Sequence, residues 1–144
     1  MTPLLIDVDT GIDDAFGLLY ALAAPKTNIV GVSTVAGNVS LNHATRNTRA
    51  VLALAGRADI PVWSGAASPL LQSARDASDI HGATGLGYAT LPVPAPATDA
   101  PHAVDAILAA SRAHDGGSRC GARRRFAPRR VISRCERATN RAKR

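Results

Sequence analysis

The chain has 144 residues, of which 46% are hydrophobic and 19% charged, a balance typical of one globular domain and not of a disordered chain. Aromatic residues make up only 3%, so broad stacking surfaces for nucleic-acid bases are scarce. No apolar run approaches the roughly 18 residues of a membrane span, and acids stand where a signal peptide would carry basic residues. We therefore expect a cytoplasmic protein that does not cross a membrane.

The net charge of +6 conceals two unlike segments. Residues 1–116 hold six Lys and Arg against ten Asp, whereas residues 117–144 hold eleven Lys and Arg against Glu136 alone. Both cysteines, Cys120 and Cys135, lie in the second segment without the further ligands of a zinc site, so we expect neither a disulfide nor zinc. No strand or helix period fits this segment. We predict a folded domain over 1–116 and a basic, disordered tail over 117–144.

The N-terminal residues predict a strand followed by a helix. The unbroken apolar run from Pro3 to Val8 is typical of a strand buried on both faces in a parallel sheet. Apolar residues then recur every three or four positions and define the buried face of a helix that ends before Pro25: Ile12, Ala15, Phe16, Leu19, Leu22 and Ala23.

The same alternation continues along the chain. Asn28 to Val35 predicts a second strand, Ser40 is a suitable N-cap for a helix that reaches about Gly56, and Ile60 to Trp63 predicts a short third strand. Strands that alternate with helices in this way form an α/β fold. We predict an open, mostly parallel, Rossmann-like sheet with flanking helices.

A long loop and one more helix complete the predicted domain. Residues 64–101 are rich in Gly, Ser and Pro, and His81 stands at the front of a glycine-rich stretch that could close over a substrate. Asp99 is a suitable cap for the next helix, with Pro101 in its first turn. The predicted inner face of that helix consists of Val104, Ile107, Leu108 and Ser111.

Four carboxylates, Asp7, Asp9, Asp13 and Asp14, lie within eight residues at the start of the first helix. Two like charges about 4 Å apart repel by roughly 4 kcal/mol at an effective dielectric near 20, while a helix N-terminus returns only about 0.3 to 1 kcal/mol per acid. Either some of these acids stay protonated, or a hard cation with oxygen ligands binds among them. We favour the cation, although Asp13 and Asp14 alone are equally well explained as helix caps.

The segment Asp7-Val-Asp9-Thr-Gly-Ile-Asp13-Asp14-Ala resembles the metal-binding signature of the inosine-uridine preferring nucleoside hydrolases. Further segments are similar to that family in its order and spacing: Val35-Ala-Gly37-Asn38, Ile60-Pro-Val-Trp-Ser-Gly65 and Ile80-His81-Gly82. Asp9 and Asn38 also each follow the end of a predicted strand, where open α/β sheets bind ligands. The resemblance covers residues 1 to about 116.

This resemblance implies that a ribonucleoside is hydrolysed to free base and ribose with the help of a bound calcium ion, Ca2+. Asp9 would be the catalytic base that takes a proton from the attacking water, in a reaction with an oxocarbenium-like transition state. By the family's pattern, Asp7, Asp9 and Asp14 would hold the metal. Asp13, Asn38 and His81 would bind the substrate. A homo-oligomer is compatible with the sequence.

The segment after Gly117 departs from the family, whose members are about twice as long. Nothing there resembles the groups that would complete the calcium shell, so we leave open whether this chain is active alone. One hypothesis is a frame shift in GC-rich coding DNA, which would yield mostly Arg, Ala, Gly, Pro and Ser. Reading the DNA from residue 117 in another frame should then restore an apolar strand; otherwise a natural truncation is preferred.

Two other classes of function remain in view. A haloacid dehalogenase-like phosphatase would use Asp7 of Asp7-Val-Asp9 as its nucleophile, but that class needs neither Asp13 nor Asp14. A non-catalytic fragment could instead bind nucleic acid through its Arg-rich tail, with an affinity that falls steeply with salt. The tail has Phe126 as its only aromatic ring, so we regard such binding as incidental.

Overall fold

The computed structural model describes residues 3–92, 94–95, 100–114 and 119–122, and for 119–122 it describes the backbone alone. Over these residues four strands form one parallel sheet: β1 (Pro3–Val8), β2 (Asn28–Thr34), β3 (Val62–Ser64) and β4 (Arg119–Ala122). Their order in the sheet is β3-β2-β1-β4. The predicted open, parallel α/β fold is therefore confirmed.

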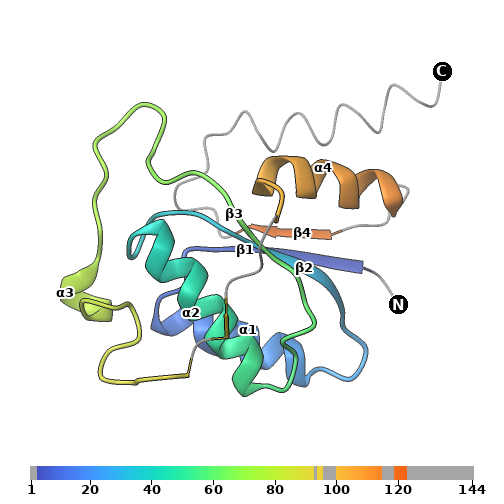
Figure 1. Cartoon of the computed structure of the whole chain (residues 1–144), viewed down its shortest axis with the longest axis horizontal. Coiled ribbons are helices and arrows are strands. Elements are labelled where there is room, and N and C mark those ends of the chain that lie inside the picture. The colour runs from blue at the N-terminus through green and yellow to red at the C-terminus, as the bar shows by residue number, and fades with distance from the viewer. Residues whose placement is uncertain (1–2, 93, 96–99, 115–118, 123–144) are drawn as a thin grey trace.

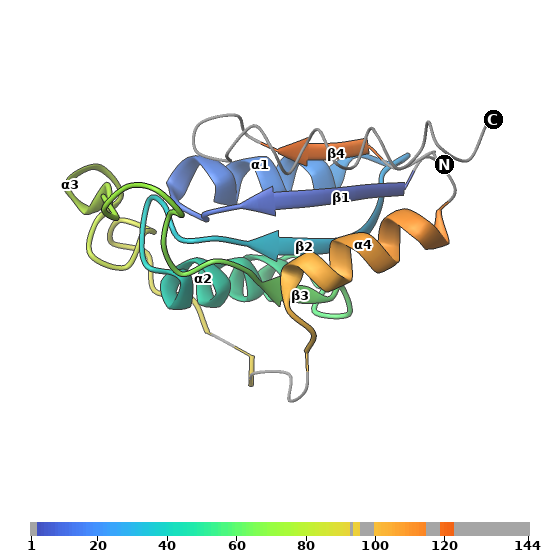
Figure 2. The ribbon, with the colours of Figure 1, turned by 90° about the horizontal axis from the view of Figure 1, so that it is seen from above.

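Helices cover both faces of this sheet. Figure 1 shows α1 (Ile12–Ala23) and α2 (Leu41–Leu54) on one face and α4 (Ala103–Ala113) on the other. The short helix α3 (Ser78–His81) lies in the long connection between β3 and α4, and Figure 2 shows it beyond the end of the sheet toward which β1 and β2 point. None of the helices in the described part of the chain has the length and apolar character that a membrane span requires.

The strand order places a switch point beside β1. From β1 the chain adds β2 and then β3 on one side, whereas β4 pairs with the opposite edge of β1. Open α/β sheets bind ligands at the carboxyl ends of strands where the order reverses in this way. Asp9, the first residue after β1, therefore stands at the position that the topology favours for a site.

The core lies between the sheet and the pair α1 and α2. Its buried residues come from β1, α1, β2, α2 and the connection before β3: Val8, Leu18, Ile29, Val32, Val51, Leu52 and Ile60. Ser40 caps α2 as predicted, because its Oγ accepts a hydrogen bond from the His43 backbone N–H at 3.4 Å.

The buried face of α1 differs from the prediction. Phe16 is 69% exposed, whereas Leu18, which the spacing left out, is 1% exposed. Nearly every residue of α1 after Asp14 is apolar or small, so periodicity alone could not choose between neighbouring stripes. In the folded protein, the face of α1 that contains Asp14 and Leu18 is the one buried against the rest of the fold.

The prediction for α4 was wrong in two respects. Ala103 and Ala106 are buried and Val104 and Leu108 are about half exposed, whereas the predicted Ile107 and Ser111 are partly buried. Small side chains let α4 approach the strands closely, since a Cβ added at Gly65 would lie only 3.3 Å from the Ala103 Cβ. The N-cap is His102, whose Nδ1 accepts from the Val104 N–H at 3.3 Å, and not the predicted Asp99, which lies outside the described residues.

Two further elements were not predicted. The helix α3 interrupts the long loop, and Asp76 supports its start by accepting hydrogen bonds from the backbone N–H and hydroxyl of Ser78, which lower the pKa of Asp76. The predicted disordered tail was wrong at its start, because residues 119–122 form β4. Parallel pairing with β1 supplies backbone hydrogen bonds whatever the side chains are. The remainder of that segment, 123–144, lies outside the described residues.

Two glycines should respond in opposite ways to an added methyl group. A Cβ at Gly31 on β2 would overlap the Trp63 ring, whereas a Cβ at Gly17 on α1 would meet nothing within 4 Å. We expect Gly31→Ala to destabilise the fold by about 1 to 3 kcal/mol through overpacking. Gly17→Ala should stabilise it by about 0.5 to 1 kcal/mol through helix propensity. Denaturant unfolding measures the free energy of unfolding of both variants. Equal changes in the two would contradict the close approach of Gly31 to Trp63.

Candidate active site

The carboxylate of Asp9 is held at the end of β1 by Asn38, which follows β2. The Asn38 backbone N–H donates to Asp9 Oδ2 at 2.7 Å, and the Asn38 side-chain Nδ2 donates to Asp9 Oδ1 at 3.2 Å. The adjacent, parallel strands β1 and β2 bring the two turns together. The predicted convergence of Asp9 and Asn38 is thus present, and both oxygens of the carboxylate have fixed directions.

Two glycines make this close approach feasible. A Cβ at Gly37 would overlap the Asp9 carboxylate, and a Cβ at Gly11 would lie 2.7 Å from His81 Nδ1 and 2.9 Å from Asn38 Nδ2. No side chain fits at either position without moving the groups around it. The side chains of Asn38 and His81 therefore both lie close to Gly11.

Asp13 and Asp14 lie in the first turn of α1. Asp14 is only 6% exposed, and its Oδ2 accepts a hydrogen bond from the Asp9 backbone N–H at 3.3 Å. The helix N-terminus also favours negative charge in its first turn. The turn between β1 and α1 therefore brings Asp9 and Asp14 together, with Asp13 partly buried beside them.

His81, the last residue of α3, reaches the same turn from a distant part of the sequence. Its Nδ1 accepts a hydrogen bond from the Ile12 backbone N–H at 3.2 Å. An imidazole nitrogen that accepts carries no proton, so we infer that the neutral ring is protonated on Nε2. His81 thus offers one N–H donor to a ligand.

Asp7 is oriented differently from the other acids. It lies on β1, and its Oδ1 accepts a 2.5 Å hydrogen bond from the Ser33 hydroxyl on β2. Burial raises the pKa of the Asp7 carboxyl, the Ser33 hydrogen bond partly offsets this, and the charge of Asp9 raises it further. Ser33 is a partner that the sequence analysis missed.

Buried polar residues beneath the turn were also missed. The Thr10 and Thr48 hydroxyls lie 2.6 Å apart, and Asn47 Nδ2 donates to the Thr10 carbonyl oxygen at 3.1 Å. Asn47 and Thr48 share an α2 stripe with Ala44 and Val51, all of them buried. Polar residues at three- and four-residue spacing inside an apolar stripe were the available sequence signal.

In the part of the chain that the structure describes, no group of three or more His, Cys, Asp or Glu side chains is arranged to hold a metal ion. Asp9 and Asp14 meet at one turn, whereas Asp7 is directed to Ser33. The metal-binding roles of these three residues therefore stay predictions, as do the substrate-binding roles of Asp13, Asn38 and His81.

Comparison with known proteins defines the class. Residues 4–120 match the family model of the inosine-uridine preferring nucleoside hydrolases, and the chain belongs to that family. It is 37% identical over 113 residues to an inosine-uridine preferring nucleoside hydrolase of Leishmania major, which covers 78% of this chain and 36% of that protein. It is 39% identical over 113 residues to a pyrimidine-specific ribonucleoside hydrolase of a Shewanella species, with coverage of 78% and 36%.

Solved structures agree with this assignment. A plant nucleoside hydrolase matches with a TM-score of 0.77 at 32% identity, over 83% of this chain and 38% of that one. A purine-preferring ribonucleoside hydrolase from Gardnerella vaginalis matches with a TM-score of 0.76 at 26% identity, over 82% and 39%. The chain thus spans less than two fifths of the length of these relatives.

Removing the charge of Asp7 should change the dependence of stability on pH. A carboxyl whose pKa is raised in the folded state adds stability at low pH and loses it as the pH rises through the folded pKa. We expect Asp7→Asn, measured with chelator at pH 7, to melt at a higher temperature than the unaltered chain. The difference should vanish below the ordinary carboxyl pKa of 3.8. A constant difference from pH 3 to pH 7 would show that ionisation of Asp7 is not its cause.

Proposed function

We propose that this chain carries the catalytic base and part of the metal and sugar site of a calcium-dependent ribonucleoside hydrolase. The reaction splits the N-glycosidic bond with water and gives a free base and ribose. The observation that carries the proposal is the clamp of Asn38 on Asp9, at the carboxyl end of β1 and beside Asp14 and His81. These residues lie inside the segment that matches the family.

The donor set suits a hard divalent cation. Asp9 and Asp14 offer carboxylate oxygens at one turn, and oxygen atoms are the ligands that calcium prefers. Asp7, two residues before Asp9, would join them by turning away from Ser33. When bound, the cation supplies a more acidic water and a fixed positive charge close to the sugar.

Each side chain of the site has a distinct role in this proposal. Asp9 accepts the proton of the attacking water, and its two hydrogen bonds from Asn38 fix the direction in which it does so. The Asn38 amide has a further N–H and a carbonyl oxygen to offer to the nucleoside. His81 donates from Nε2 to a sugar hydroxyl, and Asp13 accepts from another.

The whole reaction is a proposal, since the chain spans less than two fifths of the length of the relatives described above. Relatives with purine-preferring, pyrimidine-specific and inosine-uridine preferring names all match, so we propose ribonucleosides as the substrate class without a choice of base. Cytoplasmic location, a homo-oligomeric state and incidental nucleic-acid binding by the tail stay predictions from the sequence.

The phosphatase alternative is less well supported than the hydrolase. It requires Asp7 as the nucleophile, but burial raises the pKa of that carboxyl, and the class has no need of Asp13 and Asp14 at the start of α1. A nucleophilic carboxylate needs to be ionised and open to its substrate.

Calcium binding is the most direct test of the metal site. In titration calorimetry of the metal-free chain, Asp9→Ala and Asp14→Ala should each lower the calcium affinity by about tenfold or more, because each removes a charged oxygen ligand. Asp105→Ala is the matched control, since Asp105 is an exposed acid on α4 and its loss changes the net charge equally. If both site variants bind calcium with unchanged affinity, Asp9 and Asp14 are not ligands of the metal.

Release of base from inosine and uridine tests the chemistry. With calcium present, we expect Asp9→Ala to lower the rate by about 10² to 10⁴, the usual contribution of a general base, and chelator to abolish the reaction. Because the chain is short, residues 1–116 should also be placed in the Leishmania major relative in exchange for its own segment. An active hybrid that keeps its rate after Asp9→Ala would disprove the role of Asp9.

A further inference from the structure

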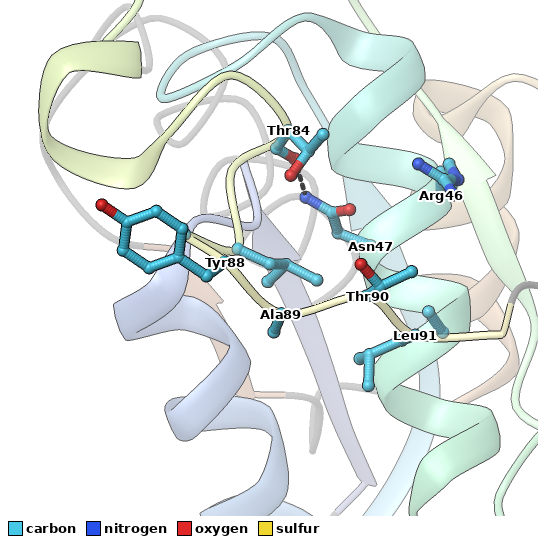
Figure 3. Close-up of a pocket in the computed structure, with 10 residues that line it drawn as sticks. Arg46, Asn47, Thr84, Tyr88, Ala89, Thr90 and Leu91 are labelled. Carbon is cyan, nitrogen blue, oxygen red and sulfur yellow. Dashed lines mark hydrogen bonds between the residues drawn. The ribbon is translucent and has the colours of Figure 1, made fainter.

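Helix α2 contributes one buried amide that touches both segments of the candidate site. Asn47 is 3% exposed, and its Nδ2 donates to the carbonyl oxygen of Thr10 at 3.1 Å and to that of Thr84 at 2.7 Å. Figure 3 shows the Asn47 side chain directed from α2 to the backbone at Thr84, while Arg46 points elsewhere. The two N–H bonds of one amide group thus connect two segments far apart in sequence.

The two carbonyls belong to the segments that carry the proposed catalytic groups. Thr10 directly follows Asp9, and its hydroxyl is held by Thr48. Thr84 lies three residues after His81, in a turn closed by hydrogen bonds from Gly85 N–H to the Gly82 oxygen and from Gly87 N–H to the His81 oxygen. Asn47 therefore holds the backbone of both segments, at Thr10 and at Thr84.

The contact has the features of a specialised site and not of incidental packing. Asparagine is a poor residue for the middle of a helix, and burying its amide is costly unless the amide is hydrogen-bonded. Gly85 adopts φ +89°, and a Cβ there would lie 2.8 Å from Asn47 Nδ2. The loop thus approaches the amide closely because residue 85 is glycine.

Two hydrogen-bonded links join His81 and the turn after it to the segment after β1. One is the bond from Ile12 N–H to His81 Nδ1, which uses a ring that a ligand would also contact, and the other is the bridge through Asn47. Thr90 and Leu91 continue the same segment along a cavity of about 270 Å³ beside α2, and Leu91 packs against the hydrophobic core.

We propose that Asn47 is a positioning residue that sets the distance of His81 from Asp9, so that both side chains can act on the same bound nucleoside. This role deepens the proposed function and rests on it. The bridge itself, however, is a property of the fold that can be measured without substrate or metal. Loss of the two donors should loosen the segment 82–87 and the turn at Thr10 together, because both carbonyls lose the same partner.

Amide hydrogen exchange on the metal-free chain tests the bridge. Asn47→Leu keeps the approximate size of the side chain and removes both donors. Val51→Ala is the matched control, because Val51 is 1% exposed on the same helix but faces the hydrophobic core. After correction for global stability, we expect exchange at Ile12, Gly85 and Gly87 to accelerate by about tenfold or more in Asn47→Leu and to be unchanged in Val51→Ala. Equal acceleration in the two variants would overturn the proposal.

A second variant guards against misfolding of the first. Gly85→Ala pushes the loop away from an intact Asn47 and should loosen the same amides. In NMR spectra both variants should shift the ring resonances of His81 but not those of His102, which caps α4 on the opposite face of the sheet. If the His81 resonances stay in place in both, the positioning role is wrong.

Activity separates this inference from the proposed function. In an active protein, Asn47→Leu should lower kcat/KM by about tenfold beyond any effect of Val51→Ala, and an equal effect would overturn the positioning role. Should the hybrid with unaltered residues 1–116 fail to release base from inosine or uridine, the proposed function fails. In that case, an acceleration of amide exchange in Asn47→Leu that is confined to residues 10–12 and 82–87 would still establish the bridge.

Discussion

The site depends on one arrangement, the grip of Asn38 on the carboxylate of Asp9. It exists because β1 and β2 are parallel neighbours, so the turns after them emerge side by side. Gly37 permits the contact, since any side chain there would occupy the place of the carboxylate. A carboxylate that receives a backbone and a side-chain donor needs no rearrangement before it acts, which is the general advantage of a preorganised site.

Stability and function pull in opposite directions at this end of the sheet. Asp14 is 6% exposed, and burial raises the pKa of Asp7, so the fold bears the cost of placing acids where water is scarce. Hydrophobic side chains of the same volume could be buried there at a lower cost in free energy. Under the proposed function, the concentrated carboxylates serve to bind a divalent cation.

Helix α2 shows how the scaffold serves the site. Val51 and Leu52 bury apolar surface in the core, while on the same helix Asn47 donates to the Thr10 carbonyl oxygen and Thr48 is hydrogen-bonded to the Thr10 hydroxyl. Asn47 also reaches the segment after His81. The helix that secures the sheet therefore also determines how the two functional segments lie relative to each other.

The sequence by itself determined the elements with strong periodicity and the identity of the chemical groups. The strands β1 and β2, the cap at Ser40 and the acids after β1 could be read directly, because strand pattern, capping and charge crowding are local properties. The alternation of strands and helices predicted the α/β fold, and the family resemblance supplied the nucleoside hydrolase class, which the comparisons confirm.

Only the tertiary structure decided which faces and partners these elements acquired. The apolar residues of α1 allowed several stripes, and contact with the sheet selected Leu18 over Phe16. The segment at 119–122 became β4 because the free edge of β1 could pair with it, which no side-chain pattern encodes. The partners Ser33 and Asn47 likewise depend on strand register and on contacts between residues 37 positions apart. Such long-range geometry is set by packing and hydrogen bonding of the whole fold, and local sequence does not contain it.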